Sequence, residues 1–203
     1  MTFSIIIPAH NAEGRLGRML SSIRRQTFLD YEIVVVCDKC VDNTKQVALG
    51  YGCRVFECDY GNSGMARNVG LDNAVGDWIM FADDDDQWIN DYALEQLRAE
   101  IACCPQVPDV IQCPFVFGWL GVTAVGNRRV NANVWSKVWR RESIGDTRFP
   151  NVYPDDDLQF INLMLAKGLG VIFMPILWYD YNYMRKGSIT WKEEMKKQGQ
   201  PIA

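Results

Sequence analysis

Four consecutive aspartates, Asp83, Asp84, Asp85 and Asp86, directly follow the short apolar segment 78–82. An apolar run of this length predicts a buried strand. Four adjacent carboxylates repel one another and are costly to keep ionised without a cation, and carboxylate oxygens favour Mg²⁺ or Mn²⁺. Because ligands of open α/β sheets bind beyond the carboxyl ends of strands, the run predicts a divalent metal site. The alternative, an acidic cap for the next helix, would need one acid and not four.

Composition narrows the class of protein. The chain has 203 residues, of which 48% are hydrophobic and 23% charged, and this balance predicts one globular domain with a substantial core. The formal net charge of −4 argues against nucleic acid as the main partner. No apolar run approaches the length of a membrane-spanning helix, and the N-terminus lacks the basic segment of a signal peptide. We therefore expect a cytoplasmic protein without a transmembrane segment, with peripheral membrane contact left open.

The seven cysteines are odd in number, and several lie in apolar, strand-like runs. This pattern favours free thiols in a reducing compartment over a disulfide framework. Cys37 and Cys40 form a Cys-x-x-Cys pair, but no second pair follows, and His10 is the one histidine in the chain. The sequence therefore disfavours a zinc or redox role for this pair.

The elements that must position these residues alternate along the first half of the chain. Apolar runs predict strands over residues 3–8, 32–37, 53–58 and 78–82. Helical spacing and turn signals predict helices over residues 16–23 and 42–51, and from the turn 61–64 to about residue 74. This alternation predicts an α/β fold with a mostly parallel central sheet and helices on both faces.

The second half of the chain is less regular. Its patterns predict helices over residues 91–103, 155–168 and 190–200, and strands over residues 110–119, 122–130 and 171–174. No repeat or low-complexity linker separates the two halves. We therefore expect a single domain over residues 1–203.

Five segments, taken in order, resemble the family 2 glycosyltransferases, which have the Rossmann-like GT-A fold. They are residues 5–11, 16–27, 36–44, 64–68 (Gly-Met-Ala-Arg-Asn) and 82–88 (Ala-Asp-Asp-Asp-Asp-Gln-Trp). The chain departs from the family pattern at His10, where the family has tyrosine, and at Lys39 and Cys40. The resemblance covers most of the chain. It implies that residues 1–90 bind a nucleotide-sugar and that residues 91–203 bind the acceptor.

The resemblance also implies roles for the donor-binding residues. Trp88 sets the register of the acidic run, so that Asp83 and Asp85 form the family's Asp-x-Asp pair. Asp85 is then the principal metal ligand, and Asp83 is a metal or ribose contact. Asp84 is grouped with the donor-binding residues, although alternation along extended chain points it away from its neighbours. The other donor-binding candidates are Pro8, Ala9, Asn11 and Asp38 for the nucleoside, and Arg67 and Arg185 for the diphosphate.

Three of these candidates have a structural alternative. Asp38 can accept a hydrogen bond from a nucleobase imide, or it can cap a helix. Arg67 follows a glycine-rich turn near a helix start, where backbone amides favour anions, but it can equally form a buried pair with an aspartate. Arg185 and Ser188 lie in residues 183–190, which loosely resemble a family loop that closes over the diphosphate, and which otherwise form a solvated basic turn.

The general base is expected in the second half of the chain. Residues 153–158 resemble the family's Glu-Asp pair before a helix, with Asp155 in place of the glutamate and Asp156 as the base. Such a carboxylate suits the deprotonation of a sugar hydroxyl during direct displacement, which inverts the anomer. The run of three acids leaves this register open by one residue, and an acidic first turn that complements the helix dipole is the alternative. Trp135 and Lys137 either contact the acceptor or belong to the core.

These features together predict a metal-dependent, inverting glycosyltransferase with Mn²⁺ or Mg²⁺ as cofactor. The expected donor is a nucleotide-sugar, most simply a UDP-sugar. The expected acceptor is a hydroxyl of a glycan, a lipid-linked sugar or another molecule in surface glycan synthesis. Two alternatives stay open: a non-catalytic nucleotide-sugar-binding module, and a nucleotidyltransferase. The second alternative usually has a basic glycine-rich loop after the first strand, whereas residues 8–13 here contain no Lys or Arg. A dinucleotide oxidoreductase is not expected, because no G-x-G-x-x-G motif follows a predicted strand.

Overall fold

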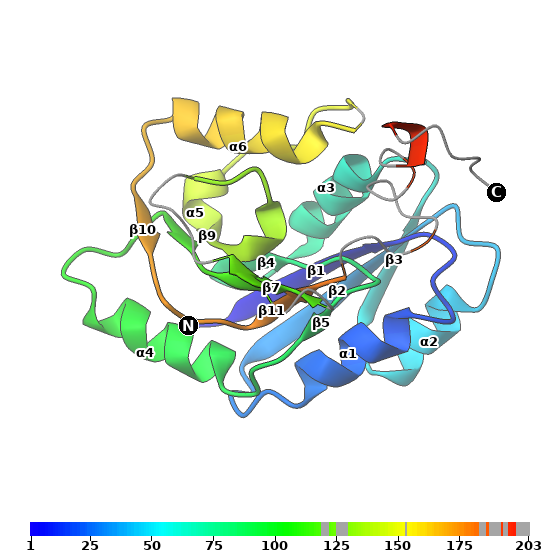
Figure 1. The fold of residues 1–203 in the computed structure, drawn as a ribbon, viewed down its shortest axis with the longest axis horizontal. Helices are drawn as coiled ribbons and strands as arrows, with labels where there is room; N and C mark the ends of the chain where they lie inside the picture. Colours follow the sequence, from blue (N-terminus) through cyan, green and yellow to red (C-terminus); the bar gives the residue numbers. More distant parts are fainter. Residues whose placement is uncertain are drawn as a thin grey trace.

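The computed structural model describes residues 1–118, 122–124, 130–152, 154–182, 186, 192 and 195–197. Its centre is a seven-stranded sheet with the strand order β10-β6-β9-β4-β1-β2-β3. Helices cover both faces of this sheet (Figure 1). The predicted α/β fold with a mostly parallel sheet is therefore confirmed.

The first half of the chain forms the parallel part of the sheet. Strand β1 (Phe3–Ala9) pairs in parallel with β2 (Tyr31–Asp38) and with β4 (Trp78–Phe81), and β2 pairs with β3 (Arg54–Cys58). The intervening helices are α1 (Leu16–Arg24), α2 (Thr44–Gly50) and α3 (Ser63–Asn73). Each element predicted for this half is present.

Side chains alternate along β1 and divide the core into two layers. Ile5 and Ile7 pack with Leu20 of α1 on one face, and Ile6 packs with Ala66 of α3 on the other. The first layer also contains residues of α2 and α4 (Ala93–Cys103), and the second contains residues of α5 (Arg141–Ile144) and α6 (Asp156–Ala166). Because both faces of the sheet are covered, its central strands β1 and β4 are almost continuously apolar.

Two of the departures from prediction in the second half concern the strands β6, β7 and β9. Strand β9 (Lys137–Arg140), which the sequence analysis did not predict, lies antiparallel between β4 and β6 (Val110–Gln112). The single strand predicted over 110–119 is two strands, β6 and β7 (Phe115–Phe117), which belong to different sheets. Pro114 lies between them and has no backbone N–H for a continued ladder, which accounts for the break.

A smaller second sheet has the order β5-β11-β7-β8. Its strands are β5 (Gln87–Trp88), β11 (Tyr179–Tyr181), β7 and β8 (Val122–Ala124). Strand β10 (Val171–Phe173) is the edge strand of the larger sheet, next to β6. A short 3₁₀ turn, η2 (Val134–Ser136), directly precedes β9. Much of the helix predicted over 190–200 and much of the strand predicted over 122–130 lie outside the described residues, and the described residues 192 and 195–197 are helical.

Two further properties bear on the sequence analysis. None of the helices in the described part of the chain is long and apolar enough to cross a bilayer. All seven cysteines are described, and each is a free thiol. Cys37 is buried at the end of β2, where burial and the neighbouring Cys40 raise the pKa of its thiol to about 12.

Candidate active site

The parallel strands β1, β2 and β4 end at the same edge of the sheet, and the candidate residues gather there. Residues 83–86, which we call the acidic loop, follow β4 and continue into β5. Residues 8–11, which we call the donor loop, end β1, and Asp38 ends β2. The antiparallel strand β9 begins at this edge, and so it adds residues from the second half of the chain.

The acidic loop does not present four equivalent carboxylates. Asp83 pairs with Arg67 (Oδ1 to Nη2, 2.8 Å), Asp84 with Arg15, and Asp86 with Tyr179. The backbone carbonyl of Asp85 accepts hydrogen bonds from the side chains of Arg18 and Asn182. Each acid therefore has its own partner or role, and the loop is fixed from both halves of the chain.

Asp86 is an anchor for the acidic loop. It is 1% exposed, and its Oδ2 accepts a hydrogen bond from the hydroxyl of Tyr179 at 2.6 Å. Its Oδ1 accepts the backbone N–H of Asn182 at 2.7 Å. Burial, together with repulsion from Asp83 and Asp85, raises the pKa of Asp86 well above the ordinary value. A carboxylate that is this enclosed is suited to holding the loop on β11.

Arg67 lies on α3 between the acidic loop and α6. It is 4% exposed, and its guanidinium pairs with three carboxylates, those of Asp83 (2.8 Å), Asp156 (3.1 Å) and Asp157 (2.8 Å). These carboxylates raise the pKa of Arg67 despite the opposing effect of burial. The sequence left two roles open for Arg67, an anion contact or a buried pair with an aspartate, and the structure contains the buried pair. Contact with a diphosphate stays a prediction.

The three acids at the start of α6, Asp155 to Asp157, differ in how far they are buried. Asp155 is exposed. Asp156 is 4% exposed, and its Oδ2 accepts hydrogen bonds from Ser63 (3.0 Å) and Arg67 (3.1 Å). It packs so closely on α3 that a Cβ at Gly64 would lie 2.8 Å from its Oδ2. Asp156 therefore joins α6 to α3.

Among the three acids at 155–157, Asp157 is the one that both pairs with Arg67 and is partly exposed to solvent. Its side chain is 24% exposed, Oδ1 contacts Arg67 at 2.8 Å, and Oδ2 accepts the backbone N–H of Val134 at 3.3 Å. Burial and repulsion from Asp83 raise the pKa of Asp157 to about 6, although Arg67 opposes the shift. Asp157 thus lies close enough to the acidic loop for the charge of Asp83 to affect its pKa.

The donor loop has an unusual backbone that its neighbours hold in place. Asn11 has a positive φ of 46°, and its Oδ1 accepts the backbone N–H of Val41 at 2.9 Å. The ring nitrogen Nδ1 of His10 lies 2.7 Å from the backbone oxygen of Asp38. Pro8 and Ala9 belong to the end of β1, and their contact with a nucleoside stays a prediction. These contacts join the donor loop to the segment that follows β2.

Asp38 is buried, and its carboxylate organises the turn that enters α3. Oδ1 accepts the backbone N–H groups of Tyr60 (2.8 Å) and Gly61 (3.0 Å), and Oδ2 accepts that of Asn62 (2.8 Å). Asn62 in turn caps α3 by accepting the N–H of Met65 at 3.0 Å. This arrangement resembles the capping alternative, and nucleobase recognition by Asp38 stays a prediction.

Several predicted residues lie away from solvent or outside the described part of the chain. Trp135 is 5% exposed and stacks on Tyr179, with ring centroids 4.6 Å apart. Lys137 is fully buried, and its Nζ donates to Asn131 and to the carbonyl of Asn133. Burial lowers the pKa of Lys137 to about 7. Both side chains are therefore core residues beneath the site, and Arg185 and Ser188 lie outside the described residues.

Arg15, Tyr179 and Asp157 are site residues that were not predicted from the sequence. Tyr179 and Asp86 are 93 residues apart in sequence, and Arg15 and Asp84 are 69 apart. No local pattern links residues so distant. The one available signal was the run of three acids at 155–157, which already left the register of the base open.

The acidic loop fits a hard divalent cation that takes part of its coordination from a ligand. Among the described residues, no group of three or more His, Cys, Asp or Glu side chains could hold a metal ion alone. Mg²⁺ is typically bound through one or two carboxylates together with substrate phosphates and water. Asp84 and Asp86 are buried, whereas Asp83 and Asp85 are partly exposed, so Asp83 and Asp85 are the carboxylates that suit this role.

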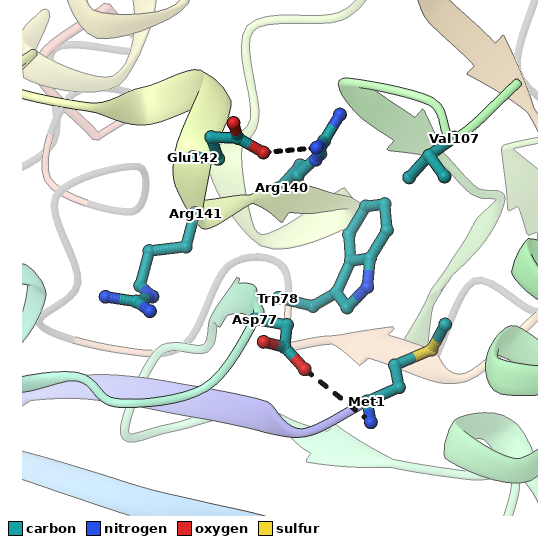
Figure 2. A pocket seen from close by; sticks show the side chains of 7 residues that line it. All are labelled: Met1, Asp77, Trp78, Val107, Arg140, Arg141 and Glu142. Atoms are coloured by element: carbon teal, nitrogen blue, oxygen red, sulfur yellow. Dashed lines mark hydrogen bonds and ion pairs between the residues drawn. The ribbon is translucent and has the colours of Figure 1, made fainter.

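A pocket on the opposite edge of the sheet is unrelated to this site. It has a volume of about 570 Å³ and lies where β1 and β4 begin (Figure 2). Asp77 contacts the amino group of Met1 at 3.6 Å, and Arg140 pairs with Glu142 across the pocket wall. None of the residues predicted for the site lines this pocket.

A mostly parallel sheet with an acidic loop after β4, tied to acids of a later helix, is the arrangement of a GT-A glycosyltransferase domain. Residues 4–117, more than half of the chain, match the family described as Glycosyl transferase family 2, and the chain belongs to this family. The family prediction is therefore confirmed.

The relatives in this family are named glycosyltransferases. The chain is 35% identical over 109 residues to the poly(ribitol-phosphate) β-N-acetylglucosaminyltransferase TarS of Staphylococcus aureus, covering 50% of this chain and 19% of TarS. It is 36% identical over 90 residues to the UDP-Glc:α-D-GlcNAc-diphosphoundecaprenol β-1,3-glucosyltransferase WfgD of Escherichia coli, covering 42% of this chain and 36% of WfgD. The chain thus matches a minor part of each relative.

Solved structures show the same fold. Residues 1–349 of S. aureus TarS, in complex with UDP-GlcNAc, align with a TM-score of 0.79 and 25% identity, covering 94% of this chain and 61% of that one. The mannosyltransferase PcManGT from Pyrobaculum calidifontis, in complex with GDP-Man and Mn²⁺, aligns with a TM-score of 0.69 and 16% identity, covering 94% and 59% of the two chains. The second likeness concerns the fold alone.

Proposed function

We propose that this chain is the catalytic domain of a metal-dependent, inverting glycosyltransferase that transfers a sugar from a UDP-sugar to an acceptor hydroxyl in surface glycan synthesis. One observation carries the proposal. Arg67 pairs at 2.8 Å with both Asp83 of the acidic loop and Asp157 of α6. A single guanidinium therefore brings the candidate metal-binding acid and a candidate base to one place.

The donor loop and Asp38 are the candidate nucleoside-binding residues. They lie side by side at the ends of β1 and β2, joined by the contact between His10 and the backbone of Asp38. UDP-GlcNAc is the ligand of the TarS structure that aligns with this chain, which supports a uridine nucleotide. The division into a donor half, residues 1–90, and an acceptor half, residues 91–203, is part of the proposal.

Asp83 and Asp85 would hold the divalent cation, Mn²⁺ or Mg²⁺. The cation supplies Lewis-acid stabilisation of the diphosphate that leaves with the nucleoside. Arg67 contributes a fixed positive charge behind Asp83. Because Arg67 and Arg15 already pair with Asp83 and Asp84, they offset part of the negative charge that the acidic loop would otherwise concentrate.

The general base is assigned here to Asp157, one residue after the position that the sequence analysis favoured. A base must reach the acceptor, and the side chain of Asp157 is 24% exposed whereas that of Asp156 is 6% exposed. Asp157 removes the proton of the acceptor hydroxyl as the oxygen attacks the anomeric carbon. The nucleoside diphosphate departs from the opposite face, so the anomeric configuration inverts. Asp156 then holds α6 against α3, and Asp155 is at the solvent-exposed helix start.

A binding and turnover assay with UDP-sugars tests the proposal. We expect UDP-GlcNAc or UDP-Glc with Mn²⁺ to raise the melting temperature, because a ligand that binds the native state alone stabilises it. We also expect slow release of UDP from the bound donor and faster release with an acceptor. Stabilisation without UDP release under either condition would favour the non-catalytic module. Pyrophosphate release from UTP and a sugar phosphate would favour the nucleotidyltransferase.

A further inference from the structure

Arg15 joins the donor loop to the acidic loop. Its Nε and Nη2 donate to the two carboxylate oxygens of Asp84 at 2.7 and 2.9 Å. Its Nη1 donates to the backbone carbonyl of Asn11 at 2.7 Å, and Nη2 also donates to that of His10 at 2.9 Å. The planar guanidinium is suited to such forked contacts, which a lysine ammonium cannot reproduce. One side chain therefore fixes two loops at once.

The contact lies where the sheet itself no longer connects the two loops. Strands β1 and β4 are paired up to Ile6 and Phe81, and Ala82 donates one more backbone hydrogen bond to Ile6 at 3.0 Å. The donor loop and the acidic loop come after this point. Among the described residues, Asp84 is their meeting point, because it accepts from Arg15 and also from the backbone N–H of His10 at 3.4 Å.

Asp84 is well enclosed, and this makes the pairing specific. It is 8% exposed. Asn11, whose carbonyl Arg15 holds, has a left-handed backbone that few residues other than glycine and asparagine adopt readily. Removing the guanidinium would thus release both a buried carboxylate and a constrained turn.

We propose that Arg15 and Asp84 are positioning residues, which set the separation between the donor loop and the acidic loop. This inference rests on the proposed function, in which the donor loop binds the nucleoside and the acidic loop binds the diphosphate through the metal. Asp84 then acts on the donor through Arg15 and does not contact it directly. The two halves of a nucleoside diphosphate bind cooperatively only if their subsites are held at the correct spacing.

The test separates the two halves of the ligand. The variants are Arg15→Gln, Arg15→Lys and the double variant Arg15→Gln/Asp84→Asn, in which no buried carboxylate is left unpaired. Arg24→Gln is the control, because Arg24 ends α1, which Arg15 precedes, and it donates to the carbonyls of Tyr51 and Gly52 and lies over the ring of Tyr31, none of which belongs to either loop. Calorimetry measures the binding of uridine, of pyrophosphate with Mn²⁺, and of UDP with Mn²⁺. Circular dichroism checks that each variant is folded.

We expect the double variant to bind UDP with Mn²⁺ about 10-fold or more weakly, and each separate half within about three-fold of the unmodified protein. Arg15→Lys should show the same pattern as the double variant, because the charge alone does not rebuild the fork. UDP binding by the double variant within about three-fold would overturn the inference. An equal loss for uridine would also overturn it, since Arg15 would then be a direct nucleoside contact. If the unmodified protein binds no uridine nucleotide, the proposed function itself fails.

Discussion

The hydroxyl of Tyr179 lies 2.6 Å from Oδ2 of Asp86, and both side chains are almost completely buried. The same hydroxyl accepts the backbone N–H of Asp83 at 2.9 Å. A single phenol on β11 therefore fixes both ends of the acidic loop. Trp135 stacks beneath Tyr179 and holds the ring in place. The candidate metal site thus depends on a strand that is contributed late in the chain.

Tyr179→Phe should weaken this anchor. The substitution leaves a buried carboxylate oxygen and a backbone N–H without their partner, and we expect the free energy of unfolding to fall by about 1–3 kcal/mol. Urea denaturation measures it. Tyr92→Phe, at an exposed tyrosine on the surface, is the control and should change stability by less than about 0.5 kcal/mol. Equal stability of the two variants would show that the Tyr179 hydroxyl does not anchor the loop.

Asp85→Ala should abolish Mn²⁺-dependent turnover of the UDP-sugar donor without unfolding the protein. Because the substitution also removes a negative charge from a crowded loop, the melting temperature of the metal-free protein should stay the same or rise. Turnover is measured as UDP release over a range of Mn²⁺ concentrations. Asp146→Ala, at an exposed aspartate outside the loop, should behave as the unmodified protein. Full turnover by Asp85→Ala would contradict the assignment of this ligand.

Asp157→Asn and Asp156→Asn distinguish the two possible bases. Asp157→Asn should lower sugar transfer by about 10²-fold or more, the usual scale for a general base, while donor binding with Mn²⁺ changes only a few-fold. Asp156→Asn should mainly lower stability, because it weakens the contacts with Ser63 and Arg67. NMR of the product should find the inverted anomer. The base is Asp156 if its folded variant alone loses the rate, and a retained anomer would contradict single displacement.

The rate of transfer should depend on pH through Asp157. A general base works in its deprotonated form, and the pKa of this carboxyl is raised to about 6. We therefore expect kcat/KM to be constant above this pH and to fall as the pH is lowered through about 6. In Asp157→Asn, the residual rate should lack this acidic limb. A profile that is unchanged down to about pH 4.5 would be inconsistent with Asp157 as the base, since an ordinary aspartate titrates near 4.

The stability of the metal-free protein should depend on pH through Asp84 and Asp157. The folded-state pKa values of Asp84 and Asp157 are both raised, from 3.8 to about 6. Between pH 4 and 6 the folded state therefore binds more protons than the unfolded state, and the free energy of unfolding rises as the pH is lowered from about 7 to 5. Denaturant titrations at several pH values measure this slope. Asp84→Asn should reduce it, and a slope that is the same in this variant would exclude Asp84 as a source.

The sequence alone determined the elements of the first half and the place of the acidic loop. Strands β1, β2 and β4 and helix α3 follow from apolar runs and turn signals that are local in the chain. The parallel arrangement follows from their alternation, and it places the donor loop, Asp38 and the acidic loop at one edge of the sheet. The resemblance on which the family was predicted lies in these same segments, and the match over residues 4–117 agrees with it.

Only the tertiary structure decided what each acid does. Local patterns cannot distinguish Asp83, Asp84 and Asp86, because they are chemically identical neighbours. Their partners, Arg67, Arg15 and Tyr179, come from three other parts of the chain, and the pairing of Arg67 with Asp156 and Asp157 spans 89 and 90 residues. Strand β9 could not be predicted from the sequence either, because its four residues carry no distinct periodicity. Its place in the sheet depends on pairing with β4 and β6. Burial and charge pairing are properties of segments brought together by folding, so they set the roles of these carboxylates where sequence spacing could not.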